Sequence, residues 1–154
     1  MNVNATLSPD DLARACADAM WREDEASRGL GMEIVDIRAG QATLAMTVQP
    51  HMVNGHGIAH GGFIFTLADS AFAFACNSRN ERTVAAQGAI TFIRSGKLGD
   101  RLVAEAREVS RSGRSGIYDV RVTAGDVVIA EFRGHSRSIG GALVPSEAAG
   151  HDKT

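Results

Sequence analysis

The sequence predicts a single α+β domain in which a curved antiparallel sheet wraps around one long central helix. Three observations predict this fold. The chain has 154 residues, enough to build a core without disulfide or metal support. Its longest apolar run, residues 63–76, has the length of a helix. Segments with strand character lie on both sides of this run, so a sheet is the only large apolar surface available to cover the helix.

The N-terminal part of the domain predicts one short amphipathic helix. Ser8 is a suitable N-cap, Pro9 suits the first helical position, and Asp10 and Asp11 suit the first turn. The apolar residues that follow are spaced to share one face, and they are Leu12, Cys16, Ala19 and Met20.

Alternating apolar residues then predict strands. Segments 32–38 and 41–48 flank Ala39-Gly40 and are typical of a hairpin. A buried helix is expected from about Gly61 to residue 77 or 78. Turn-rich joints separate four further strands, which we expect to form a meander: 87–94, 101–109, 116–123 and 126–137. We expect the domain to span residues 1–139 and residues 140–154 to be a disordered tail.

Composition excludes several classes of function. Charged residues make up 22% of the chain and the net charge is -2, so neither nucleic acid nor an anionic membrane is an expected partner. The run 63–76 is too short for a membrane span. Two cysteines form no disulfide framework and the first residues do not resemble a secretory signal, so we expect a cytoplasmic protein.

Asp69 is the one acid inside the most apolar segment of the chain. An unpaired carboxylate in a dry core costs several kcal/mol or becomes protonated. Asp69 should therefore face solvent, a cleft or a subunit interface. It could equally point outward or bond to a neighbouring backbone amide without any catalytic role.

The segment before Asp69 indicates an anion-stabilising site. His60, Gly61 and Gly62 open the predicted helix with small residues, so the N–H groups of the first turn are unhindered. Such a helix end can bind a phosphate or stabilise an oxyanion. Plain turn chemistry would give the same glycines.

Geometry limits how Gly61 and Asp69 could cooperate. They are eight residues apart, which is about 12 Å along a helix axis. A base or nucleophile must act within about 3.5 Å of the reacting carbon, directly or through one water. If both are catalytic, Asp69 must come from a second protomer whose helix runs antiparallel, as a two-fold dimer allows.

Residues 54–78 carry a resemblance to a known family. The string NGHGIAHGGFIFTLADSAFAFACNS, with the helix and strand order around it, closely resembles the hotdog-fold acyl-CoA thioesterases, specifically the phenylacetic-acid-degradation subgroup. The resemblance covers about residues 10–138, and its signature is an Asn, then H-G-G and L-A-D at fixed spacing. It implies a sheet wrapped around one helix, dimers whose sheets join, and often tetramers.

The resemblance also implies roles for four residues. Asp69 would activate water or attack the thioester carbon, and the Gly61 amide would polarise the carbonyl oxygen. Asn54 and His60 would make supporting contacts. A thioester has a good leaving group, so one carboxylate and one oxyanion donor can suffice, and we expect no metal and no cofactor beyond the coenzyme A of the substrate.

Coenzyme A carries phosphates that need cations or free backbone amides. The predicted contacts are the segment 110–115 first and Arg94 next. In full, the candidates are Arg111, Ser112, Arg114, Arg94, Lys97 and the Gly62 amide. The acyl group would enter between the helix and the partner's sheet, where Phe63, Phe72 and Phe74 could line a wall or belong to the core. Its identity stays open between aryl-acetyl, hydroxylated phenylacetyl and medium-chain groups.

Three alternatives stay open. His51, His56 and His60 fall within ten residues, which raises a metal-dependent hydrolase, although their spacing matches no common zinc signature. The same fold could host an enoyl-CoA hydratase or dehydratase with His60 and Asp69 as an acid/base pair. The protein could also bind acyl-CoA without catalysis.

Overall fold

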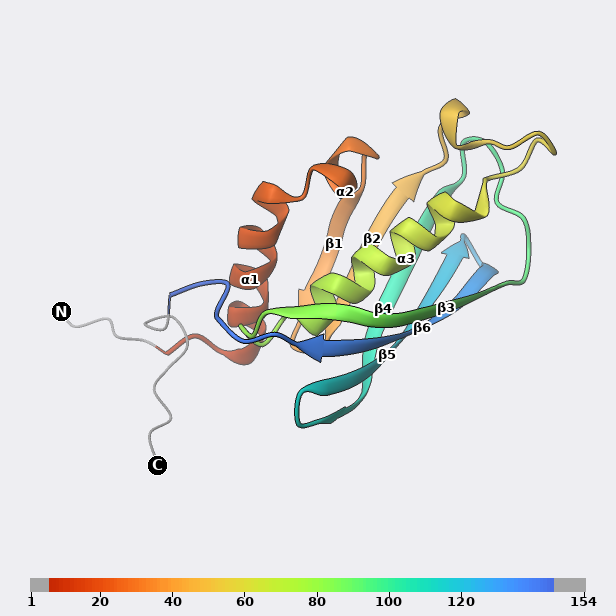
Figure 1. Cartoon of the computed structure of the whole chain (residues 1–154). Coiled ribbons are helices and arrows are strands. Elements are labelled where there is room, and N and C mark those ends of the chain that lie inside the picture. The colour runs from red at the N-terminus through yellow and green to blue at the C-terminus, as the bar shows by residue number, and fades with distance from the viewer. Residues whose placement is uncertain (1–5, 146–154) are drawn as a thin grey trace.

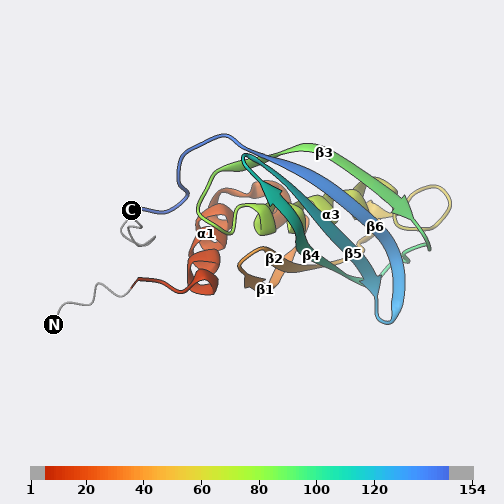
Figure 2. The same ribbon diagram turned by 90° about the horizontal axis from the view of Figure 1, so that it is seen from below.

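A computed structural model describes residues 6–145 of the chain. The helices are α1 (Pro9–Glu23), α2 (Glu25–Gly29) and α3 (Gly61–Cys76), and Pro50–Met52 form a 3-10 turn. The strands are β1 (Glu33–Arg38), β2 (Gln41–Thr47), β3 (Thr83–Phe92), β4 (Arg101–Ser112), β5 (Ser115–Ala124) and β6 (Val127–Ser138). Helix α3 lies in the hollow of the curved sheet (Figures 1 and 2). The predicted architecture is confirmed.

Helix α1 begins as its sequence predicts. The Ser8 side chain accepts a hydrogen bond from the Asp11 N–H at 3.1 Å, and Pro9 occupies the first turn. Its buried face is Ala13, Cys16 and Ala17, about one residue away in phase from the predicted face. Helix α2 was not predicted, because five residues are too few to show a helical period.

The six strands form one antiparallel sheet in the order β1-β2-β4-β5-β6-β3. The expected four-strand meander is wrong at its first strand, because β3 pairs with β6 at the sheet edge and not with β4. The loop 93–100 crosses the end of the sheet, where its carbonyls accept hydrogen bonds from the Ala59 and Val48 N–H groups. Those contacts replace the hairpin that its length suggested.

The inner face of α3 supplies the centre of the core. Phe72 is 1% exposed and packs against Tyr118 and Phe132, with ring centroids 5.6 and 5.8 Å away. Burying such a ring stabilises the fold by roughly 1.5–3 kcal/mol. A Cβ on Gly134 would lie 2.8 Å from the Phe72 ring, so β6 requires glycine there. The buried residues Phe72 and Phe74 therefore belong to the core and not to an acyl wall.

The opposite face of α3 and the strand β3 are open. Gly62, Phe65, Thr66, Asp69 and Ala73 are all at least partly exposed. Strand β3 has no charged residue and has a paired neighbour on one side only among the described strands. Natural proteins usually protect such an edge with charges, bulges or a covering segment.

The end of the described chain returns to the domain. Residues 141–144 lie in the segment expected to be a disordered tail. Here the Asn80 Oδ1 accepts the N–H groups of Leu143 and Val144, and the Arg82 N–H donates to the Gly141 carbonyl. Residues 146–154, also in that segment, lie outside the described residues. Over residues 6–145, no helix is both long and apolar enough to cross a membrane.

Candidate active site

Helix α3 begins at Gly61 and is capped by His60. The His60 backbone lies in the extended region, and its Nδ1 accepts a hydrogen bond from the Gly62 N–H at 2.9 Å. The N–H of Phe63 donates to the His60 carbonyl. The Gly61 N–H has no acceptor among residues 6–145, so it is the donor left free at the positive end of the helix. The predicted ligand contact of the Gly62 amide would first require breaking the cap.

Phe92 explains in part why position 61 is glycine. A Cβ on Gly61 would lie 2.8 Å from the Phe92 ring, closer than real Cβ contacts. Phe92 ends β3, is 51% exposed and was not among the predicted site residues. No local pattern around Phe92 indicates this contact with Gly61, because the two segments lie about 30 residues apart in the chain.

Asn54 organises the loop before the helix. Its Oδ1 accepts from the N–H groups of His56 at 3.0 Å and Ile58 at 3.4 Å. A bridge between Val53 and Ala59 closes this loop. The Asn54 Nδ2 has no acceptor within the described chain and can donate to a ligand.

Asp69 lies half-buried on the open face of α3. No group in the described residues hydrogen bonds or ion-pairs with its carboxylate, and burial raises the pKa of Asp69 above its usual value. Partial desolvation makes this carboxylate a stronger base than a surface aspartate. Gly61 and Asp69 stand eight residues apart in one continuous helix, so about 12 Å along the axis separates them within the chain.

Ser70, the neighbour of Asp69, is tied to α2. Its Oγ lies 2.8 Å from the Ser27 Oγ, which in turn donates to the Asp24 Oδ2 at 2.7 Å. Because the Ser27 proton goes to Asp24, Ser70 must donate to Ser27. The Ser70 proton is therefore not available to a substrate. The sequence held no signal for this contact, which joins residues 43 positions apart.

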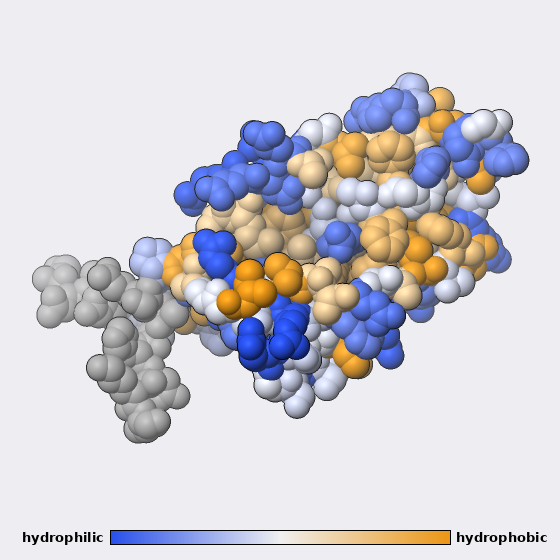
Figure 3. All heavy atoms as spheres, viewed as in Figure 1, coloured by the Kyte–Doolittle hydropathy of each residue, from blue (hydrophilic) through white to orange (hydrophobic). Residues whose placement is uncertain are grey.

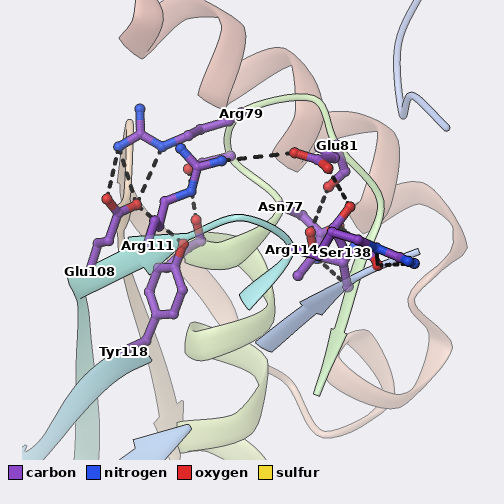
Figure 4. Close-up of polar contacts among 11 residues, drawn as sticks. Asn77, Arg79, Glu81, Glu108, Arg111, Arg114, Tyr118 and Ser138 are labelled. Atoms are coloured by element: carbon purple, nitrogen blue, oxygen red, sulfur yellow. Dashed lines mark hydrogen bonds and ion pairs between the residues drawn. The ribbon is translucent and has the colours of Figure 1, made fainter. Parts of the chain in front are cut away.

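The cationic residues predicted for coenzyme A fall at two ends of α3. Arg111 lies 3.8 Å from Glu81, and Arg114 donates twice to the Ser138 carbonyl, at 3.2 and 3.0 Å (Figure 4). Ser112 ends β4 opposite Ser115 in the same hairpin. These residues lie beyond the C-terminal end of α3, close to Cys76.

Arg94 and Lys97 lie at the other end, in the loop packed against Ala59. They line a cleft of about 680 Å³ whose other members include Arg101, Asp100 and the apolar Ile129. Neither side chain has a hydrogen-bond or ion-pair partner in the described residues. The structure therefore leaves these two cations available, whereas Arg111 and Arg114 already have partners.

The histidines of the loop before α3 are the remaining candidates. No group of three His, Cys, Asp or Glu side chains between residues 6 and 145 is placed to hold a metal ion. His51 and His60 each pack edge-on against half-buried Phe63, with ring centroids 6.0 Å away. Burial raises the pKa of Cys76 to about 12, so its thiol is not a nucleophile at neutral pH.

Comparisons with known proteins show the family to which the chain is related. The family model named Thioesterase superfamily matches residues 56–131. The chain is 41% identical to the acyl-coenzyme A thioesterase PaaI of Escherichia coli over 128 residues, which are 82% of this chain and 91% of that protein.

Solved structures give the same result. The E. coli PaaI protein from the phenylacetic acid degradation operon superposes with a TM-score of 0.86 at 40% identity, covering 88% of this chain and 99% of that one. A Streptococcus mutans protein bound to acetyl CoA matches with a TM-score of 0.69 at 29% identity, covering 72% and 90% of the two chains. The chain therefore belongs to the thioesterase superfamily and has its hotdog fold.

Proposed function

We propose that the protein hydrolyses acyl-CoA thioesters to a free acid and coenzyme A. The observation that carries this proposal is a pair of unengaged groups on one helix: the free Gly61 N–H and the unpaired, half-buried Asp69 carboxylate. One is an oxyanion donor and the other a base. The 41% identity to the E. coli acyl-coenzyme A thioesterase supports the same reaction.

The active site is shared between two protomers. The uncharged, one-sided strand β3 offers an edge on which a second copy can extend the sheet across a two-fold axis. The open faces of the two α3 helices then meet antiparallel, and Gly61 of one protomer approaches the partner's Asp69. We expect two such dimers to form a tetramer, as the family resemblance implies.

Hydrolysis needs two steps at this site. The carboxylate of Asp69 takes a proton from water as the water oxygen attacks the thioester carbon, and the Gly61 N–H stabilises the resulting oxyanion. The tetrahedral intermediate then reforms the carbonyl and expels the thiolate of coenzyme A, which takes the proton from Asp69 and so restores the carboxylate. Direct attack by Asp69, giving a transient anhydride that water cleaves, fits the same geometry.

Asn54 and His60 support the reacting carbonyl. With the His60 Nδ1 accepting from Gly62, a neutral imidazole carries its proton on Nε2. That N–H and the free Nδ2 of Asn54 are both donors, as a polarised carbonyl or an attacking water requires. Neither residue is needed as the base.

The phosphates of coenzyme A bind best at Arg94 and Lys97. Both cations line a cleft of about 680 Å³ beside the loop that precedes Gly61, and both lack internal partners. Arg111, Ser112 and Arg114 become secondary contacts, since the two arginines are already engaged. The preferred acyl groups are aryl-acetyl, hydroxylated phenylacetyl or medium-chain. We place the reaction in the cytoplasm, in keeping with the free thiols Cys16 and Cys76.

A thiol-release assay over a panel of acyl-CoA esters tests this function. We expect turnover by the wild-type protein and loss of most of the rate in Asp69→Asn, with substrate binding largely retained. A binding module would release no thiol yet keep its affinity. Hydration of enoyl-CoA without thiol release would assign the protein to the hydratases instead. Activity that disappears on chelation and returns with zinc would indicate the metal-dependent alternative.

A further inference from the structure

Three surface hollows of the domain differ in charge, and the charge of each indicates which kind of ligand it suits. The cleft at Arg94 has three cations against one acid. The hollow on the convex face of the sheet has four acids against two arginines. The third, a groove of about 550 Å³, has two arginines and two acids and is therefore balanced. A polyanion suits the first, and of the three only the third has no net charge.

The balanced groove lies between α1 and the start of β3. Its apolar members are Ala19, Met20, Val84, Ile139 and Leu143. In Figure 3 residues in orange shades gather between the α1 region and β3 on this face of the molecule. Its volume is within the range of small-molecule sites, which is roughly 300–1,000 Å³.

The groove reaches the C-terminal end of α3, where the C-cap residue Asn77 lines it. Asn77, which lines the groove, follows Asp69 and Ala73 at four-residue intervals, so the three lie along one face of the helix. About 12 Å along the axis separates Asn77 from Asp69. Asp24, which also lines the groove, is linked through Ser27 to Ser70, the chain neighbour of Asp69.

We infer that this groove receives the acyl group of the thioester, and that Met20 on α1 limits the size of the group. The inference rests on the proposed function, because it takes the reacting carbon to lie at Asp69. From the reacting carbon, the coenzyme A part of the substrate must extend to the phosphate-binding cations. The acyl group must therefore lie in a different place. The balanced groove suits this uncharged acyl group, whether it is aryl or medium-chain. Methionine suits this wall because its flexible side chain adapts to ligands of different shape.

The hydrogen-bond chain from Ser70 to Asp24 holds the groove in place. It fixes the junction between α1 and α2 to α3 beside the catalytic acid, and Ser27 at its centre is 1% exposed. Breaking a buried hydrogen bond of this kind costs free energy, so the Ser27 contacts hold the junction in one position. The wall that carries Met20 therefore stands at a set distance from Asp69.

Steady-state kinetics with acetyl-CoA, octanoyl-CoA and phenylacetyl-CoA test the inference. Met20→Trp should fill the groove and lower kcat/KM for the two larger esters about tenfold, while acetyl-CoA changes by less than about twofold. Met20→Ala should shift the preference toward larger groups. Ile139 also lines the groove, so Ile139→Trp should act like Met20→Trp and replaces it as the test if Met20→Trp does not fold. Val35→Trp is the matched control, since Val35 is exposed on β1 and does not line the groove.

The contrary results are distinct. If the wild type cleaves all three esters and neither tryptophan in the groove changes their ratio, the acyl group lies elsewhere and the inference is overturned. If the tryptophans leave the ratio unchanged but dissociate the oligomer in gel filtration, the groove holds a partner chain, which also overturns it. A wild type that cleaves none of the esters refutes the proposed function itself.

Discussion

The Nδ1 of His60 accepts the Gly62 N–H at 2.9 Å, and the N–H of Gly61 between them is left without an acceptor in the described chain. One side chain thus fulfils two needs of the helix start. It satisfies the Gly62 N–H of the first turn, and it leaves the neighbouring Gly61 N–H free to donate to a ligand. The same bond fixes the tautomer that places a proton on the His60 Nε2.

Replacing His60 should separate capping from catalysis. His60→Ala should lower the free energy of unfolding by about 1 kcal/mol, since alanine cannot cap, and should also reduce kcat. His60→Asn should restore the stability, because asparagine is a good N-cap, but should not restore kcat if the Nε2–H contacts the substrate. Urea unfolding and thiol-release kinetics measure the two effects. Full recovery of both in His60→Asn would limit His60 to capping.

Gly61→Pro should remove the oxyanion donor and keep the start of the helix, although its Cβ must displace the Phe92 ring. Proline is favoured at the first helical position, and the extended backbone of His60 is compatible with a following proline. We expect kcat to fall by about a hundred- to a thousandfold. The control is Gly61→Ala, which makes the same new Cβ contact with Phe92 but keeps the N–H. Equal losses in both variants would attribute the effect to Phe92 and not to the donor.

Local signals in the sequence predicted most of the fold. Ser8 and Pro9 predicted the start of α1, Ala39-Gly40 predicted the first hairpin, and Gly40 there has a φ of 74° that favours glycine. The run ending at Cys76 predicted the central helix almost to the residue. These features depend on neighbours in the chain, so a single sequence contains them.

What the sequence could not predict depends on distant contacts. The edge position of β3 is set by its pairing with β6, some 45 residues later. Arg114 looked available for phosphate, but its guanidinium turns to the Ser138 carbonyl. Local spacing likewise carried no information on the Ser70–Ser27 contact. The proposed catalytic residues came from the family resemblance, whose signature lies within 16 consecutive residues, from Asn54 to Asp69.

Asp69→Asn should stabilise the protein while inactivating it. Burial raises the pKa of Asp69, so the native state binds this proton more tightly than the unfolded chain does. Stability is therefore lost as the pH rises from the ordinary carboxyl pKa through the raised one, and ionised Asp69 destabilises the native state above it. At pH 7 the variant should melt at a higher temperature than the wild type, and the difference should vanish below about pH 3.5. A lower melting temperature at pH 7 would contradict a desolvated carboxylate.

The activity of the wild type should follow the same ionisation. The base must be deprotonated, so kcat should fall as the pH is lowered through the raised pKa of Asp69, and therefore at a pH above the usual aspartate range. Thiol release measured between about pH 4 and pH 9 gives the acidic side of this pH profile. A second assay, which detects coenzyme A without a thiol reagent, checks that the pH does not affect the detection itself. A profile flat down to about pH 4 would exclude Asp69 with a raised pKa as the base.

The two cationic clusters should respond differently to alanine. Arg94→Ala and Lys97→Ala should raise KM for acyl-CoA several-fold with little change in melting temperature, because neither side chain has a partner within the described residues. Arg114→Ala should mainly lower the melting temperature, because it leaves the Ser138 carbonyl without its donor. Acyl-pantetheine, which lacks the nucleotide phosphates, is the control substrate. The KM for acyl-pantetheine should be the same in Lys97→Ala and in the wild type. If Lys97→Ala raises the KM for acyl-pantetheine as much as that for acyl-CoA, Lys97 does not contact the phosphates.

Mixing two inactive variants should restore activity if the site is shared. In a dimer of Gly61→Pro and Asp69→Asn subunits, one of the two sites combines an intact Gly61 with an intact Asp69 from the other subunit. Random exchange makes half of the dimers mixed, so about a quarter of the wild-type rate should return. Each variant alone, taken through the same exchange, is the control. Because about 12 Å of helix separates the two groups within a chain, complementation is the direct consequence of an antiparallel pair of α3 helices. If the mixture stays as inactive as its components although gel filtration and mass spectrometry confirm mixed dimers, each chain must build its site alone, and the donor or the acid must be a different residue.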